Sequence, residues 1–482
     1  MRSAVSRLGA LAKVLGISLL VIPAISLLTF GPRGGEEIPS GRTVVEYWEK
    51  WTGAEEMQMR QIVADFNNSV GKEKNIYVRY MSTTAINQKT LVATAAGVPP
   101  DVAGLWESNV VQYAAQDALE PLEGMAAPAG ITRDTYKKVY WDQMNYQGHL
   151  YALISTPAAV VLHYNRLIFE SEAETLRAKG LDPTRPPRST AEMDAYADAL
   201  TKRDARGRIL RAGYFPMEPN WYVPEIWMWF GGDVFDEKTQ KITLTDPRVV
   251  ASYDWIASYT RKFGKDAAND FRGGLSTAFD SPQNAFLVNF VVMEWQGPWM
   301  ANYIDHLRPD LQRLVWPREV EMKKSIAERR KNYFWAVAPF PDKDGLGDVT
   351  YASCDILCIP RGAKHKKEAF EFIAYVNSQP VMEKLCMMHS KNSPLANVSE
   401  NFLTHHPNPY IDVFEKLAAS PHARGVPQIP IWQEMSDELT SIGQAMALAE
   451  GDAHTALEKA QTRLQSSYDN YMEIQRARLA AK

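Results

Sequence analysis

The alternation of short apolar segments with helix-period segments near the start of the chain constrains its fold most. Apolar segments at residues 44–48, 76–81 and 102–106 predict three buried strands. Between the first two strands, apolar residues recur at helical spacing and predict a helix: Met59, Ile62, Val63, Phe66 and Val70. A second helix is expected around Leu91 and Val92. This β-α-β-α-β order predicts an α/β fold built on a parallel, doubly wound sheet.

Such a sheet also predicts where a ligand binds. In open α/β sheets the ligand lies beyond the carboxyl ends of the strands, which here are residues 48–53 and 106–109. The candidate site residues after the first strand are Trp48, Glu49 and Trp51, and those after the third strand are Trp106, Glu107 and Asn109.

The length of the chain limits the number of domains, and its net charge limits the kinds of partner it can bind. A chain of 482 residues is too long for one ordinary core and predicts two or three domains. Its net charge of −4 gives no general electrostatic reason to bind nucleic acid or an acidic membrane surface. We therefore expect a small or uncharged partner.

The first thirty residues predict export from the cytoplasm. Arg2, Arg7 and Lys13 precede an uncharged apolar stretch at residues 14–30, interrupted by Pro23. A cleaved signal peptide and a retained membrane anchor both fit residues 1–30, and a buried amphipathic helix is the third alternative. The first cysteine is Cys354, so a lipid-modified cysteine after this segment is excluded.

Residues 31–41 are rich in Gly, Pro, Glu and Ser and predict a linker, so the folded body is expected to begin near Arg42. Cys354, Cys358 and Cys386 are too few for a disulfide framework, and they are expected to be buried as small apolar residues. His405 and His406 lie in a Pro/Asn-rich segment that predicts a surface loop. No metal site and no cofactor is predicted.

Three common enzyme motifs are absent from the sequence. The chain has no GxxxxGK[ST] loop for phosphate, no HExxH helix for zinc and no GxSxG nucleophile elbow. Glu49, Glu107 and Glu294 lie at predicted strand ends and could form the carboxylate pair of a glycosidase. A carbohydrate-active enzyme therefore stays as the alternative to a binding protein.

Aromatic residues beside turns favour a carbohydrate ligand. Trp221 and Tyr222 lie near Pro224, and Trp299 follows a Gly-Pro pair. Sugar rings stack their C–H faces on such side chains, while their hydroxyls need polar partners such as Gln296. Two further tryptophans of the same apolar region, Trp227 and Trp229, are expected to pack in the core.

Five ordered segments resemble a known family. They are residues 97–122, 148–170, 291–304, 353–376, and 429–435 with the helical stretch 452–464 that follows. Together they are similar to extracellular solute-binding proteins of the maltose-binding type, the sugar-capturing subunits of ABC importers. Outside these segments the chain departs from the family at two places: Tyr351-Ala352 replaces the Gly-Gly often seen before the fourth segment, and Ala396 stands where a charged residue is common.

The resemblance implies a two-lobe periplasmic-binding-protein fold of type II, each lobe a doubly wound mixed sheet flanked by helices. Three chain crossings are expected, near residues 154–159, 340–349 and 377–381. Lobe 1 is then expected at residues 42–155 and 345–377, and lobe 2 at residues 156–344 and 378–482. Hinge closure around a ligand in the cleft follows from this architecture.

The same resemblance implies that Trp106 and Asn109 occupy cleft positions and that residues 48–51 form the loop after the first strand. It also implies two aromatic side chains that stack on the ligand, Trp299 and either Trp221 or Tyr222. The implied function is non-enzymatic capture of a sugar outside the cytoplasm and delivery to permease subunits that work with a separate ATPase. A monomer suffices for this function. Binders of other small polar solutes remain an alternative, although the adjacent tyrosines typical of ferric-ion binders are missing.

One charged segment, residues 318–331, has no counterpart in the resemblance. Its sequence REVEMKKSIAERRK predicts a solvated surface helix, with a partner contact as the alternative.

Overall fold

The computed structural model describes residues 38–275, 281–311 and 316–480. The chain divides into two compact units, Met1–Arg42 and Thr43–Lys482, and every strand and helix named below belongs to the second. The predicted export segment at residues 1–30 lies outside the described residues, as does most of the predicted linker. In the described part of the chain, no helix combines the length and the apolar character needed to span a bilayer.

The first large sheet of the Thr43–Lys482 unit confirms the predicted parallel start. β1 pairs in parallel with β2 on one side and with β3 on the other. The sheet becomes mixed because β14 runs antiparallel to both β3 and β6. Its strands, in the order β15-β14-β3-β1-β2 with β6 also paired to β14, are β1 (Thr43–Glu49), β2 (Ile76–Ser82), β3 (Val102–Trp106), β6 (Ala152–Ala159), β14 (Thr350–Cys358) and β15 (Ala423–Arg424).

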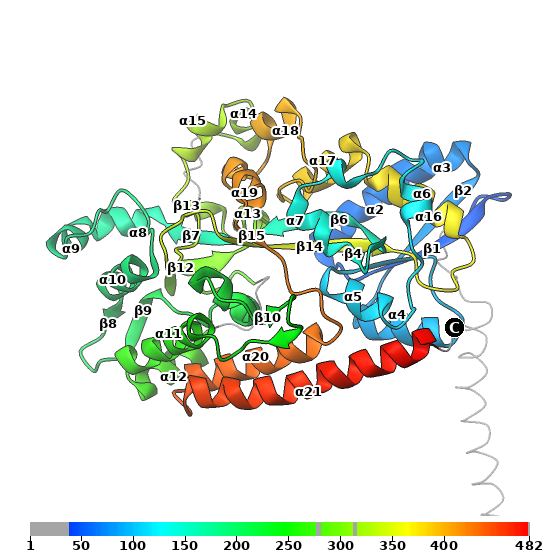
Figure 1. Ribbon diagram of the computed structural model, residues 1–482. Helices are drawn as coiled ribbons and strands as arrows, with labels where there is room; N and C mark the ends of the chain where they lie inside the picture. The colour runs from blue at the N-terminus through cyan, green and yellow to red at the C-terminus, as the bar shows by residue number, and fades with distance from the viewer. Residues whose placement is uncertain (1–37, 276–280, 312–315, 481–482) are drawn as a thin grey trace, which may run out of the picture. The chain divides into compact units, whose positions relative to one another are not determined.

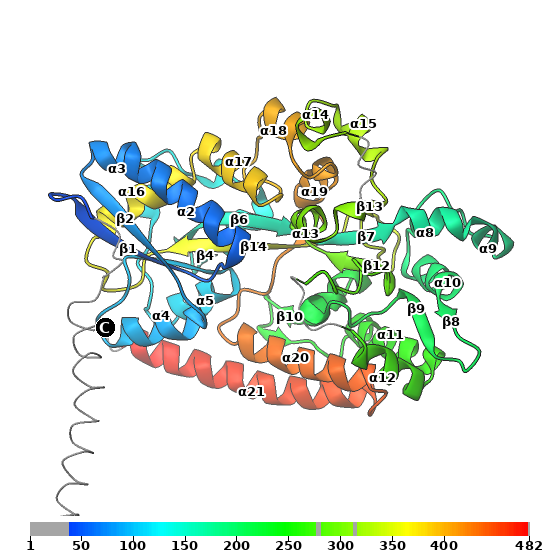
Figure 2. The ribbon, with the colours of Figure 1, turned by 180° about the vertical axis from the view of Figure 1, so that it is seen from behind.

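Helices cover both faces of this sheet. α2 and α16 lie on one side and α4 and α5 on the other (Figures 1 and 2). The apolar residues predicted for α2 are mostly buried, including Phe66, whose ring centroid lies 5.3 Å from that of Phe372 on the buried face of α16. The helices are α2 (Gly53–Asn68), α3 (Val70–Glu73), α4 (Ile86–Ala95), α5 (Ser108–Ala114), α6 (Glu123–Ala126), α7 (Lys138–Gln143), α16 (Lys366–Val376) and α17 (Gln379–Met388).

The second large sheet is also mixed, and its central strand β12 is buried at every residue. β12 runs parallel to β9 and antiparallel to β7, which in turn pairs antiparallel with β13. In the order β13-β7-β12-β9-β8, the strands are β7 (Val161–Asn165), β8 (Lys202–Arg203), β9 (Ile209–Tyr214), β12 (Val291–Gln296) and β13 (Trp335–Ala338).

Helices on the second sheet complete a second α/β lobe, so the predicted two-lobe architecture is confirmed. An 11-residue 3₁₀ helix, η2, leads from β9 toward α11 and buries Trp227 and Trp229 as predicted. The elements are α8 (Arg166–Ser171), α9 (Ala173–Ala178), α10 (Thr190–Leu200), η2 (Asn220–Phe230), β10 (Phe235–Asp236), β11 (Lys241–Ile242), α11 (Pro247–Phe263), α12 (Lys265–Gly273) and α13 (Met300–Leu307).

The chain passes between the two sheets at short connections. Val160 alone separates β6 from β7, and the loop between β13 and β14 returns the chain to the first sheet. Beyond α16, α17 packs against α2 and β6 of the first sheet before later helices reach the second. The residue boundaries given above for the lobes stay a prediction.

The C-terminal helices bring distant segments together. α21 covers almost all of the helical stretch expected at residues 452–464 and buries Leu457, Ala460 and Leu464. Along its length it contacts β11 through Gln465, which accepts a hydrogen bond from Ile242 N at 2.8 Å. These helices are α18 (Glu400–His405), α19 (Ile411–Ala418), α20 (Trp432–Ala447) and α21 (Ala453–Ala480).

Two sequence predictions are wrong: the solvated helix at residues 318–331 and the surface loop at His405 and His406, against which this segment packs. The segment forms two short helices, α14 (Arg318–Glu321) and α15 (Ile326–Arg330), instead of one solvated helix. Arg329 is fully buried and donates to the carbonyl oxygens of His406 at 2.8 Å and Pro407 at 2.6 Å. His406 is also fully buried, because these bonds satisfy its backbone and its ring packs on Phe402. His405 is exposed as expected, but it ends a helix (Glu400–His405) and does not lie in a loop.

The three cysteines, Cys354, Cys358 and Cys386, are buried and free, which confirms their predicted role as small apolar residues. Burial raises the pKa of each thiol above its ordinary range.

A close approach of β9 to α10 gives a test of the packing in the second lobe. A Cβ on Gly213 would lie 2.3 Å from the carbonyl oxygen of Ala197, and backbone atoms cannot yield as a flexible side chain can. We expect Gly213→Ala to lower the free energy of unfolding by about 1–3 kcal/mol, measured by chemical denaturation. The matched control is Gly124→Ala, where nothing lies within 4 Å of the added carbon; equal stability of both variants would contradict this packing.

Candidate functional site

A cavity with a volume of about 670 Å³ lies where segments of both lobes meet. The first lobe contributes residues that follow β1 and β3, as the strand order predicted, together with residues of β14. The second lobe contributes residues of η2 and α13, and α20 closes part of the wall. The lining includes Lys50, Trp51, Glu55, Trp106, Glu107, Thr156, Trp221, Tyr222, Glu225, Trp299, Tyr303, Tyr351, Asp355, Lys391 and Trp432.

The structure brings together six of the ten site residues predicted from the sequence. Both lobes are represented among them, and four are tryptophans. They are Trp51, Trp106, Glu107, Trp221, Tyr222 and Trp299. Whether they contact a ligand stays a prediction.

The other four predicted residues, Trp48, Glu49, Asn109 and Gln296, are not among those that line the cavity. Asn109 accepts a hydrogen bond from Trp106 N at 3.3 Å, and Gln296 accepts one from Gly297 N at 3.0 Å, so both hold the backbone behind the wall. Trp48 is half-buried on β1, where it lies opposite Met81 of β2.

Glu49 is fully buried and supports the residue that does reach the cavity. It accepts hydrogen bonds from the hydroxyl of Tyr47 at 2.6 Å and from Lys50 N at 2.7 Å. Its side chain also pairs with Lys50 Nζ at 3.3 Å. The lysine therefore stands at the position that the sequence assigned to the glutamate.

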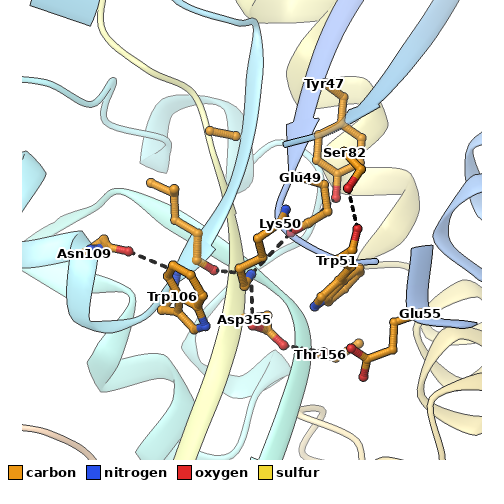
Figure 3. Close-up of polar contacts among 12 residues, drawn as sticks. Tyr47, Glu49, Lys50, Trp51, Glu55, Ser82, Trp106, Asn109, Thr156 and Asp355 are labelled. Atoms are coloured by element: carbon orange, nitrogen blue, oxygen red, sulfur yellow. Dashed lines mark hydrogen bonds and ion pairs between the residues drawn. The ribbon is translucent and has the colours of Figure 1, made fainter. Parts of the chain in front are cut away.

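A charged network that sequence reasoning missed forms one wall of the cavity. Figure 3 shows its contacts among Lys50, Asp355 and Thr156. Asp355 pairs with Lys50 Nζ at 3.0 Å and with Lys391 Nζ at 3.2 Å, and it accepts a hydrogen bond from the hydroxyl of Thr156 at 3.0 Å. Lys391 also pairs with Glu55 at 3.4 Å. The available signal was Asp355, a charged residue inside an apolar segment, whereas Lys391 lies in the polar stretch HSKNSP; neither position is near residue 50 in the sequence.

Electrostatics keep this network ionised. Burial opposes ionisation of Asp355, but the charges of Lys50 and Lys391 outweigh it and hold the pKa of the carboxyl well below its ordinary value. Burial likewise lowers the pKa of each lysine, yet nearby carboxylates more than compensate, so both pKa values are raised. Both cations are thus already engaged by carboxylates.

The same lysines lie near tryptophan rings. Lys50 Nζ is 4.9 Å from the ring centroid of Trp106 and 5.3 Å from that of Trp51. Lys391 Nζ is 5.5 Å from the ring centroid of Trp299, whose ring lies 6.4 Å from that of Trp221. Trp106 is 41% exposed and Trp221 is 46% exposed, so each leaves part of its ring open to a ligand.

Two further carboxylates, Glu107 and Glu225, line the cavity without a cation beside them among the described residues. Glu107 accepts hydrogen bonds from the hydroxyl of Tyr351 at 2.7 Å and from Cys354 N at 3.3 Å, while burial raises its pKa to about 7. Glu225 Oε2 has no hydrogen-bond partner, and burial, with the charge of Glu107, raises the pKa of Glu225 well above its ordinary value.

Glu294, the third carboxylate of the glycosidase alternative, lies inside the second lobe and not in the cavity. It is fully buried, both carboxyl oxygens lack a partner, and burial raises its pKa well above the ordinary value. Of Glu49, Glu107 and Glu294, only Glu107 reaches the cavity. Among residues 38–275, 281–311 and 316–480, no three His, Cys, Asp or Glu side chains are grouped to hold a metal ion.

Comparison with known proteins relates this geometry to a family. A family model described as bacterial extracellular solute-binding protein matches residues 61–402. None of the curated proteins compared with the chain matches it.

Solved structures share the fold over nearly their whole length. CpMnBP1 with mannobiose bound has a TM-score of 0.72 at 22% identity, over 87% of this chain and 98% of that one. The sugar-binding protein MalE of Xanthomonas citri has a TM-score of 0.68 at 18% identity, over 90% and 99%. The GacH receptor of Streptomyces glaucescens, solved unliganded and with acarbose, has a TM-score of 0.66 at 19% identity, over 89% and 99%.

The ion pairs of Asp355 predict a pH-dependent contribution to stability. Asp355→Asn would leave Lys50 and Lys391 without their shared partner, so we expect the free energy of unfolding at neutral pH to fall by about 3–5 kcal/mol. A carboxyl whose pKa is lower in the folded state stabilises the fold above its unfolded-state pKa and stops doing so as the pH falls toward its folded-state pKa. The difference between wild type and variant should therefore shrink below about pH 4.

Denaturation curves at several pH values measure this difference. The matched control is Asp254→Asn on the exposed side of α11, which should change stability by less than about 0.5 kcal/mol. An Asp355→Asn variant as stable as the wild type at neutral pH would show that the network contributes nothing.

Proposed function

Because the chain belongs to the bacterial extracellular solute-binding protein family, we propose that it captures a sugar or oligosaccharide between its lobes and delivers it to the permease of an ABC importer. The observation that carries the proposal is the cavity itself, in which tryptophans from both lobes stand beside polar and charged groups. A ligand that touches both sets of residues would favour closure of the lobes, since it gains contacts only when they meet.

The exposed rings support a carbohydrate as the ligand. Trp106 comes from the first lobe and Trp221 from the second, and both are partly open. The C–H faces of a sugar pack on such rings, while hydroxyls need donors and acceptors such as Glu107 and Thr156. The cavity volume falls within the usual range for sites of small ligands. Structures of similar fold that hold mannobiose or acarbose support the same ligand class.

A binding role without turnover fits the cavity better than glycoside hydrolysis. Glu49 and Glu294, two of the three carboxylates considered for hydrolysis, lie behind the wall or in the core. We propose that the hydrolysis of ATP belongs to a separate subunit and that the protein acts as a monomer. An oligosaccharide incubated with the protein should be recovered unchanged; release of a shorter sugar that stops on Glu107→Gln would establish the enzyme instead.

An extracellular family implies a location outside the cytoplasm. For the finer question of attachment, we propose that residues 1–30 direct export and either are removed as a signal peptide or stay as a membrane anchor. Mass determination of the mature N-terminus from the native host distinguishes these two outcomes.

Ligand capture predicts thermal stabilisation. A solute that binds the folded state raises the melting temperature with its concentration, and a free concentration 100 times the Kd stabilises the fold by about 2.7 kcal/mol. We expect at least one mono- or oligosaccharide to shift the melting curve in a thermal-shift screen. If no carbohydrate does so while an amino acid, a polyamine or a metal ion does, the sugar assignment fails.

Loss of stacking should weaken binding. We expect Trp106→Ala and Trp299→Ala each to cost about 1–3 kcal/mol of affinity for the sugar found in the screen, measured by titration calorimetry, with the fold retained. Trp48→Ala is the matched control, because Trp48 lies on β1 just before the cavity loop but does not line the cavity. Unchanged affinity in both cavity variants would show that these rings do not contact the ligand.

A further inference from the structure

The cavity wall contains more carboxyl groups than cationic side chains. The described lining residues include two lysines, Lys50 and Lys391, and four carboxylates. Asp355 pairs with both lysines and Glu55 pairs with Lys391, which leaves Glu107 and Glu225 without a cation among the described residues. These two side chains are therefore the carboxyl groups of the cavity wall that no cation of the described residues neutralises.

Glu107 and Glu225 are held in the wall, not extended into solvent. They are 3% and 5% exposed, and Glu107 is fixed by Tyr351 and by the backbone of Cys354. Glu225 Oε2 is buried with no hydrogen-bond partner. An ionised carboxylate in this position costs free energy unless an opposite charge or a proton compensates it.

The described groups that face the pair supply no positive charge. They are Tyr351, Cys354 and Asp355 on β14, Tyr222 on η2, and Tyr253 on α11. Asp355 adds negative charge, and burial raises the pKa of the tyrosines and of the Cys354 thiol, so these groups stay neutral. The charge that compensates the pair therefore comes from a proton or from a cationic group of the bound solute.

Aromatic rings next to the pair suit such a cation. The ring centroids of Tyr222 and Tyr351 are 6.2 Å apart, and that of Trp221 lies 6.4 Å from Tyr222. The faces of tyrosine and tryptophan attract an ammonium group, and the attraction grows where water is excluded. The same rings accept the C–H faces of a sugar.

We infer that the solute is a sugar bearing a protonated amine, whose ammonium group binds between Glu107 and Glu225 against the rings of Trp221, Tyr222 and Tyr351. This inference rests on the proposed function, because it names the class of sugar that the same cavity takes. The ammonium donates hydrogen bonds to both carboxylates and provides Glu225 Oε2 with the partner it lacks. Lys50 and Lys391 do not compete, since Glu49, Glu55 and Asp355 already engage them.

Calorimetric titration of the whole protein tests the inference with paired probes. Disaccharides and monosaccharides of glucosamine, galactosamine and mannosamine are compared with their N-acetylated and hydroxyl counterparts, which have the same ring but no charge. We expect at least one amine-bearing sugar to bind about tenfold or more tightly than both of its neutral counterparts. Glu225→Gln should weaken that amine by about 10–100-fold and the neutral counterparts by less than about threefold.

Glu237→Gln is the matched control, since Glu237 is exposed and lies outside this cavity. It should leave both affinities unchanged. A pH series on the wild type gives a second measurement that needs no variant. Burial raises the pKa of Glu107 to about 7, so lowering the pH from about 7 to about 5 protonates Glu107; affinity for the amine should then fall while affinity for a neutral sugar should not.

The outcomes separate this inference from the proposed function. Neutral sugars that bind as tightly as or more tightly than every amine, with affinity unchanged or strengthened at low pH, overturn the amine and leave sugar capture intact. Binding of no sugar of either kind overturns both. If Glu225→Gln does not fold, the pH series on the wild type decides.

Discussion

The shared ion pair of Asp355 is the interaction on which the cavity depends. Asp355 lies in β14, which pairs with β3, β6 and β15 and so occupies the middle of the first sheet. Its pairs with Lys50 and Lys391 tie the loop after β1 and the loop after α17 to that strand. Buried ion pairs add little net stability, but removing one partner is costly, so the network fixes geometry more than it strengthens the fold.

This geometry decides what the rest of the cavity offers a ligand. Because Asp355, Glu49 and Glu55 engage both lysines, the wall is left with open tryptophan rings and with the uncompensated pair Glu107 and Glu225. A neutral sugar could stack on these rings. A sugar with a protonated amine could do the same and could also supply the positive charge that Glu107 and Glu225 lack. The network thus disfavours an anionic ligand, because carboxylates of the protein already pair with the two lysines that would otherwise attract it.

The sequence predicted what depends on local pattern and missed what depends on contacts across the chain. The parallel order of β1, β2 and β3 followed from apolar periodicity, and Trp106 was found because it ends a strand. Side-chain direction in a strand reverses at every residue, so Glu49 was assigned to the cavity that Lys50 occupies. The pairing of Lys50 with Asp355, the burial of Arg329 against residues 406–407 and the position of Glu225 join segments remote in sequence, which periodicity cannot show.

An unsatisfied group in the cavity wall also links binding to lobe closure. Polar groups that lack a partner are rare in protein interiors, and a site for a ligand is where such a group can persist, because the ligand completes it. Glu225 belongs to η2 of the second lobe and Glu107 follows β3 of the first. A solute that binds both carboxylates gains its full interaction only when the lobes bring them together, so its charge favours the closed state beyond what stacking on one lobe could provide.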